Sequence, residues 1–336
     1  MAKHRYQHHL KKFNEIVSTT LSQDKPGHLA APHYLYKSDG RTPFFQLQGL
    51  SRIDSKISKH KDLAEGWLNS YKEIEDAFGK YDYWWVMAEN NKAWKFPQEI
   101  QNYFVNQAFF NLGVLETKLI QQGWVTKAGE KYSPSEKAVK DFKKSAKKAD
   151  WYSSAKEREK LLKFFRDEAI EIHDKLASKE IDLNLVEEGI HEFRRKARWM
   201  GIYSSALLGK VAIGKPAPND PMKEYVTPKN QEIKFNQLPQ NKDEKDLIYF
   251  LPGGFYAMSE LIKGIGDVKD PALSTEEMQK TGKLFGLTES QLKKHLGKDY
   301  KPHNIAVPQA KKMINEMVIK KRLFQHIADY FDKQLK

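Results

Sequence analysis

The chain contains no cysteine, and this absence removes several kinds of chemistry at once. Disulfides, thiolate metal sites and a cysteine nucleophile are all excluded. No apolar run approaches the roughly 20 residues that cross a bilayer. The first residues also lack the apolar core of a secretory signal. We therefore expect a cytoplasmic protein without a membrane partner.

The common catalytic and cofactor motifs are missing as well. The sequence holds no Gly-x-x-x-x-Gly-Lys-Ser/Thr phosphate loop, no Gly-x-Ser-x-Gly and no His-Glu-x-x-His. Gly264-Ile-Gly266 lacks the third glycine and the preceding strand of a dinucleotide site, and His295 and His326 have no partner at metal-ligand spacing. The sequence thus predicts a protein that is not an enzyme and that binds no metal or cofactor.

What the chain does have is positive charge. Lys and Arg number 57 against 44 Asp and Glu, so the formal net charge is +13. Such an excess favours acidic partners, among them phosphate polymers and nucleic acid, but carries no information about the fold.

Helical periodicity dominates the pattern of apolar residues. Apolar side chains recur at spacings of three and four along a long helix at Leu162, Phe165, Ala169, Ile172 and Leu176. Alternating, strand-like stretches are few, and the best of them, residues 231–238, is ended by Pro239. These patterns predict an all-α protein, and 336 residues exceed the usual size of a single core.

Two segments interrupt the helical pattern and define the predicted organisation. We expect a first helical bundle over residues 1–126, a lysine-rich linker or insertion over 127–160, and a second bundle over 161–336. A proline-rich insertion over 214–241 lies within the second bundle.

A short similarity links the two halves. Residues 72–79 and 259–266 both place Glu, an apolar residue and an apolar-Gly pair at the same offsets. An amphipathic helix with a basic face precedes each, over residues 45–59 and 188–208. The order of elements therefore predicts an internal duplication, with two antiparallel bundles related by a pseudo-twofold axis and a seam between them.

The most informative stretch is the basic helix over residues 188–208. At about 100° per residue its apolar residues share one face, while His191, Arg194, Arg195 and Arg198 gather on another. An anion would relieve the repulsion among these cations and accept forked hydrogen bonds from arginine. Two other interpretations stay open, namely a solvated helix face and structural ion pairs with Glu187, Glu188 or Asp267.

These residues resemble the signature of the CHAD family, helical proteins associated with inorganic polyphosphate. The family helix reads His-x-x-Arg-x-x-x-Arg, which His191, Arg194 and Arg198 match. A later family helix ends in Leu-Gly-x-x-Arg-Asp, and residues 265–270 are similar, with Lys269 in place of the arginine. The resemblance implies two duplicated four-helix bundles around a basic cavity. The first copy keeps only Arg52 of the histidine–arginine pattern.

The predicted function is non-catalytic binding of inorganic polyphosphate or a similar polyanion in a basic cleft between the bundles. The predicted anion-binding residues are His191, Arg194, Arg195, Arg198 and Lys269, with Arg52 and Lys56 opposite. The alternative is nucleic-acid binding through the lysine-rich segments 126–160 and 291–336. A phosphoester enzyme with His191 as acid or base is a third hypothesis, but no carboxylate cluster for a divalent metal accompanies that histidine.

Overall fold

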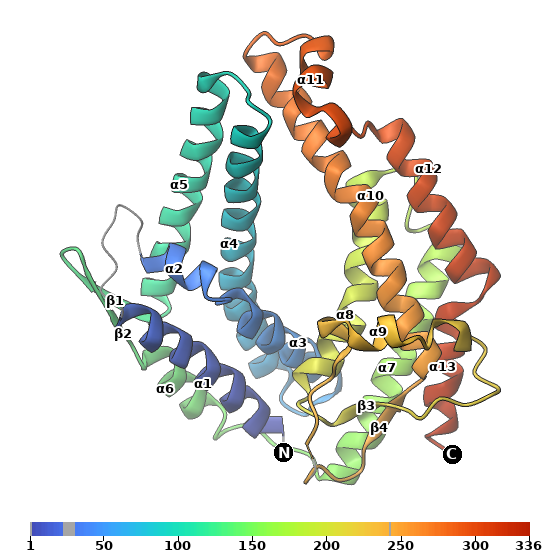
Figure 1. Ribbon diagram of the computed structural model, residues 1–336. Coiled ribbons are helices and arrows are strands. Elements are labelled where there is room, and N and C mark those ends of the chain that lie inside the picture. The colour runs from blue at the N-terminus through green and yellow to red at the C-terminus, as the bar shows by residue number, and fades with distance from the viewer. Residues whose placement is uncertain (1, 23–30, 242) are drawn as a thin grey trace. The chain divides into compact units, whose positions relative to one another are not determined.

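The protein is built almost entirely from helices (Figure 1). A computed structural model describes residues 2–22, 31–241 and 243–336, with 73% of the structure in helices and 4% in strands. The prediction of a mostly helical protein is confirmed, and two short pairs of strands are added to it. No helix in the described ranges is both long and apolar enough to cross a membrane. The chain divides into two compact units, residues 1–152 and 153–336. The internal duplication and the basic cleft stay predictions.

The first unit is a set of packed helices with one β-hairpin. Its described elements are α1 (Ala2–Leu21), α2 (Ala31–Lys37), α3 (Arg41–Ile57), α4 (Lys61–Ala93), α5 (Gln98–Gln121), β1 (Val125–Ala128), β2 (Lys131–Pro134) and α6 (Lys137–Ser145). The long helix α4 packs against α3 on one side and α5 on another. Strands β1 and β2 pair antiparallel, with Val125 opposite Pro134.

Aromatic side chains fill the centre of the first unit. Phe13 of α1, Phe44 of α3 and Trp124 are at most 1% exposed and meet edge to face, with ring centroids 4.6–5.2 Å apart. Such pairs contribute about 0.5–1.5 kcal/mol each beyond the burial of their area. This cluster fixes α1 on α3, the helix that carries Arg52 and Lys56.

The lysine-rich segment predicted as a linker or insertion, residues 127–160, contains regular structure. It spans most of the β-hairpin, all of α6 and the start of α7. Phe142 of α6 is 4% exposed and packs on Tyr6 and Trp67, with ring centroids 5.2 and 5.0 Å away. The boundary between the two units falls inside this segment, after Tyr152, so most of it belongs to the first unit.

The second unit contains a larger set of helices and one parallel pair of strands. Its described elements are α7 (Ser154–Ala177), the π-helical turn η1 (Val186–His191), α8 (Glu192–Ala206), β3 (Val211–Ile213), η2 (Lys223–Tyr225), α9 (Pro228–Glu232), η3 (Lys234–Asn236), β4 (Ile248–Phe250), α10 (Pro252–Leu284), α11 (Glu289–Leu296), η4 (Gly297–Asp299), α12 (His303–Ile314), the π-helical turn η5 (Asn315–Lys320) and α13 (Leu323–Lys333). Strands β3 and β4 pair in parallel, with Val211 opposite Ile248.

The apolar stripe predicted for the long helix of this unit is its core face. All five stripe residues are buried in α7, and Phe165 stacks on Phe331 of α13 at 5.4 Å between ring centroids. Helix α10 packs against α8, α12 and α13. This packing brings the basic helix α8 beside α10, which carries Lys269 (Figure 1).

The proline-rich insertion, residues 214–241, covers the beginning of α10. The carboxylate of Asp220 accepts the backbone N–H of Gly253 at 2.8 Å and so caps the helix start. Asn230 of α9 donates to Glu260 of α10 at 3.2 Å. The prediction of a strand over residues 231–238 is wrong, because a cap from Thr227 to the N–H of Asn230 starts a helical turn there instead.

Candidate functional site

Of the predicted site residues, His191 and Lys269 are in direct contact. His191 ends η1 and Lys269 lies on α10, yet the Nζ of Lys269 is 3.1 Å from the Nδ1 of His191. Lys269 is only 4% exposed. Because an ammonium only donates, Nδ1 of His191 must accept, and the imidazole proton then resides on Nε2. The exposed carboxylate of Asp270 lies 2.8 Å from the same Nζ atom.

Arg194 joins the same cluster by lying flat on α10. A Cβ added to Gly266 would come within 2.7 Å of its Nη2 atom, so the guanidinium occupies the space that a larger residue would fill. The Nε of Arg194 donates to the carbonyl of Ile262 at 3.0 Å. This contact uses one donor of the guanidinium and holds the side chain in place beside α10.

Arg198 completes the group, which we call the His191 cluster: His191, Arg194, Arg198 and Lys269. Burial lowers the pKa of His191, and the positive charges of Lys269, Arg198 and Arg194 lower it further. The opposing carboxylate of Glu187, 3.9 Å from Nε2, is exposed and does not reverse this effect. The cluster is therefore a half-buried region of positive potential in which the imidazole stays neutral at pH 7.

Arg195 points to a different partner. Its guanidinium pairs with Glu192 on its own helix, with Nη2 2.6 Å and Nε 2.8 Å from Oε2. Arg195 thus pairs within its own helix, and its place in the anion-binding group stays a prediction. The alternative interpretation paired the arginines with Glu187, Glu188 or Asp267. In the structure Glu187 lies 3.9 Å from Nε2 of His191, and Asp267 pairs with Lys263.

Arg52 and Lys56 lie on α3 in the first unit. Arg52 is partly buried and Lys56 is exposed. The prediction that they face the basic helix across a cleft stays a prediction.

The turn that positions His191 has a local cause. Gly189 lies within η1 and packs against the backbone of residues 182–183. A Cβ at this position would come within 1.9 Å of the carbonyl oxygen of Asp182. Only glycine allows this approach, which lets the π-helical turn lead directly into α8. Single π-helical turns of this kind occur frequently at functional sites.

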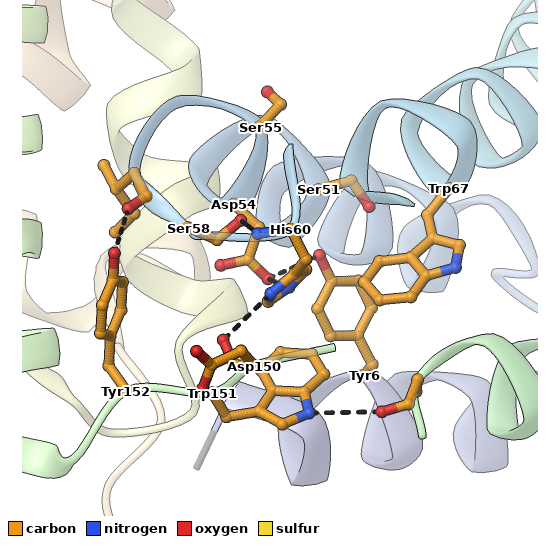
Figure 2. Close-up of polar contacts among 12 residues, drawn as sticks. Tyr6, Ser51, Asp54, Ser55, Ser58, His60, Trp67, Asp150, Trp151 and Tyr152 are labelled. Carbon is orange, nitrogen blue, oxygen red and sulfur yellow. Dashed lines mark hydrogen bonds and ion pairs between the residues drawn. The ribbon is translucent and has the colours of Figure 1, made fainter. Parts of the chain in front are cut away.

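A second polar cluster, in the first unit, was not predicted from the sequence (Figure 2). Asp54 of α3 accepts a hydrogen bond from the hydroxyl of Tyr6 at 3.1 Å, and its Oδ2 lies 3.9 Å from Nε2 of His60. The Nδ1 atom of His60 is 3.2 Å from the carbonyl oxygen of Asp150. Tyr6 and Asp150 lie far along the chain from Asp54 and His60, so local spacing carries no signal for the cluster as a whole.

Aromatic rings enclose this second cluster. His60 lies 4.6 Å from Trp151, and Trp151 stacks on Trp67 at 6.2 Å, both measured between ring centroids. Lys59 pairs with Asp150 at 2.7 Å, next to the same turn. We call the contacts of residues 150–152 with the turn between α3 and α4 the Trp151 clasp. Its contacts are internal to the first unit, and they hold the last residues of that unit in place.

Metal-binding geometry is not found in the part of the chain that the structure describes, where no three His, Asp or Glu side chains gather closely enough to hold an ion. Compared with known proteins, the chain matches no family model, no curated protein and no solved structure. The functional argument therefore depends on the geometry of the two clusters.

Proposed function

We propose that the protein binds a phosphate-rich polyanion, with inorganic polyphosphate as the reference ligand, through the His191 cluster and without catalysis. The observation that carries the proposal is the contact between the buried amine of Lys269 and the ring of His191, beside two arginines. A bound phosphate group would neutralise these charges and accept hydrogen bonds from arginine in pairs.

The second polar cluster, in the first unit, is a weaker candidate for ligand binding. The side chains of Asp54 and His60 are 11% and 6% exposed, and they face a hydroxyl, a carbonyl and aromatic rings of the same unit. In the His191 cluster, by contrast, the side chain of His191 is 33% exposed. The accessible cluster is the one with an excess of positive charge, and it supports binding of an anion.

Two finer statements belong to this proposal. The first is membership of a CHAD-like class, for which the spacing of His191, Arg194 and Arg198 and the position of Lys269 are the support. The second is the internal duplication, in which Gly79 of α4 corresponds to Gly266 of α10. In both helices an arginine from another helix lies against that glycine.

Nucleic-acid binding through the lysine-rich segments has less support. Within residues 126–160, Lys127, Lys137, Lys140 and Lys156 each lie within 3.4 Å of a carboxylate. Within residues 291–336, Lys293, Lys320, Lys321 and Lys336 do the same at 3.2 Å or less. Neighbouring opposite charges cancel much of the field that would attract a phosphate backbone.

The test is removal of the two arginines by neutral substitution. We expect Arg194→Gln with Arg198→Gln to weaken binding of long-chain polyphosphate at least about tenfold, because each hydrogen-bonding interaction with a charged group contributes about 1.5–3 kcal/mol. Isothermal titration calorimetry at fixed salt measures the affinity.

Arg195→Gln with Lys196→Gln is the matched control. It removes the same charge from the same helix, but both side chains pair with carboxylates there. The control should keep affinity within about twofold, and circular dichroism should show both variants folded. Equal affinities of the folded double variants would reject the His191 cluster as the binding site.

A further inference from the structure

The first unit contains a cluster with the same construction as the His191 cluster. Arg41, the first residue of α3, lies against Gly79 of α4, where an added Cβ would come within 2.5 Å of its Nη2 and 3.1 Å of its Cζ. At Gly266 of α10 the corresponding separations from Arg194 are 2.7 and 3.2 Å. In each unit, therefore, a guanidinium lies on a glycine of a long helix.

The residue four positions before each glycine contacts the arginine in both units. In the second unit the Nε of Arg194 donates to the backbone carbonyl of Ile262. In the first unit the Nε and Nη2 of Arg41 donate to the carboxylate of Glu75, at 2.9 and 2.7 Å. Glu75 is 6% exposed, so a buried carboxylate takes the place of an uncharged carbonyl.

The residue three positions after each glycine carries opposite charges in the two units. Lys269 contacts the ring of His191 in the second unit. Asp82 holds that position in the first unit, where it accepts from Nη1 of Arg41 at 3.1 Å and from the hydroxyl of Tyr36 at 2.6 Å. In both units this residue contacts a side chain that carries a ring and lies a few residues before the arginine, namely His191 in the second unit and Tyr36 in the first.

We infer that the first unit carries a counterpart anion site that is closed by its own carboxylates, Glu75 and Asp82. This inference rests on the proposed function of the His191 cluster. The ligand class is the same, phosphate or sulfate oxygens, and the arginine that would receive them is Arg41. The side chain of Arg41 is 29% exposed, so it remains within reach of solvent once the carboxylates are removed.

Because the site is closed by carboxylates, the number of ligands bound per chain depends on the charges at Glu75 and Asp82. With Glu75 and Asp82 present, the Nε, Nη1 and Nη2 atoms of Arg41 each already donate to an internal carboxylate. A single short phosphate chain per molecule is then expected, held by the second unit. Exchanging the two carboxylates for the charge pattern of the second unit should open a second site.

The experiment is a gain of binding in a protein whose second-unit site has been removed. Glu75→Gln with Asp82→Lys is introduced into the Arg194→Gln, Arg198→Gln background, and binding of tripolyphosphate is measured by calorimetry. Glu65→Gln with Asp76→Lys in the same background is the control, because it makes the same charge change at exposed positions of the same helix. We expect binding at least about tenfold tighter than in the control, with one ligand per chain.

A second variant, with side chains of nearly the original size, covers the case in which the lysine variant does not fold. Glu75→Gln with Asp82→Asn keeps the size of both side chains and should also bind more tightly than the background, though less than the lysine variant. A folded pair of variants with no gain over the control would overturn the inference. Because the background lacks the His191 cluster, this result is separate from the test of the proposed function, which compares the unmodified chain with the Arg194→Gln, Arg198→Gln variant alone.

Discussion

At the scale of single residues, the contact between His191 and Lys269 determines how the site responds to protons. Neutral His191 accepts from Lys269 at Nδ1, so the next proton must enter at the atom that faces the ammonium. Burial, together with this repulsion, keeps the pKa of His191 below its ordinary value of about 6.5. An anion placed between the two groups would lower the cost of charging the ring.

Anion binding should therefore tighten in acid. Because bound sulfate raises the pKa of His191, affinity should increase as pH falls below about 6.5, by up to about tenfold for each unit of that rise. Sulfate is the suitable probe, since this anion of a strong acid keeps its charge over the range of about pH 5 to 8 in which histidine titrates. Calorimetric titrations across that range measure the effect.

His191→Gln is the control for this dependence. Glutamine can still accept from Lys269 but has no proton to gain, so the tightening should disappear. The sign for stability is opposite in the unbound protein: a lowered folded-state pKa means that the unfolded chain takes up the proton first. Stability from this group is then present above about pH 6.5 and is lost as pH falls. An unchanged pH profile in the glutamine variant would assign the effect to another group.

Individual residues also show what a sequence can and does not reveal about this site. The pair between Arg195 and Glu192 is local, at a spacing of three on one helix, and could have been read from helix geometry. The contact between His191 and Lys269 joins helices far apart in the chain, and only a family resemblance indicated it. Arg41 was missed because its partners, Glu75 and Asp82, lie on a different helix.

At the scale of elements, the Trp151 clasp holds residues 150–152 against the turn between α3 and α4. Tyr152 donates to the carbonyl of Ile57 at 3.1 Å, and Trp151 lies on both His60 and Trp67 (Figure 2). These contacts order the end of the first unit without a helix or strand. Aromatic burial and a few hydrogen bonds supply the stability that regular structure gives elsewhere.

Removing the indole ring of Trp151 should destabilise the first unit. Full truncation of a buried tryptophan costs about 3–5 kcal/mol, and Trp151 is partly buried, so we expect Trp151→Ala to cost about 2 kcal/mol. Urea unfolding followed by far-ultraviolet circular dichroism measures the change. Phe110→Ala, at a side chain that is 69% exposed in the same unit, should stay within about 0.5 kcal/mol. Equal small effects would show that the clasp adds little to stability.

Helices were predictable from the sequence and strands were not. The buried stripe of α7 repeats every three or four residues, so its own sequence specifies which face is buried. Strands β3 and β4 are three residues each, and their pairing joins Val211 to Ile248 across the proline-rich insertion. The apolar run over residues 83–87 is only partly in the core, because Tyr83 and Val86 are 36% and 44% exposed while Met87 is buried. Pattern alone does not say which neighbour covers a helix.

At the scale of the whole molecule, the net charge of +13 is spread over a surface on which many lysines pair with carboxylates. Exposed pairs of this kind contribute about 0–1 kcal/mol each to stability and partly cancel in the field around the protein. A diffuse positive surface and a localised site differ in how their affinity depends on salt concentration. For a diffuse surface the loss of affinity with salt follows the total charge, whereas for a localised site it follows the few cations that touch the ligand.

The dependence of polyphosphate affinity on salt separates these two cases. Each cation that neutralises a phosphate makes the plot of log affinity against log salt steeper by about 0.7–0.9. If the His191 cluster holds the ligand, Arg194→Gln with Arg198→Gln should make that slope shallower by about 1–2, since two neutralising contacts are lost. Arg195→Gln with Lys196→Gln removes an equal charge from α8 but should leave the slope nearly unchanged, because both side chains already pair with carboxylates. Equal reductions of slope in both variants would mean that the ligand follows total charge, and the surface as a whole, rather than the cluster, would then be the binding site.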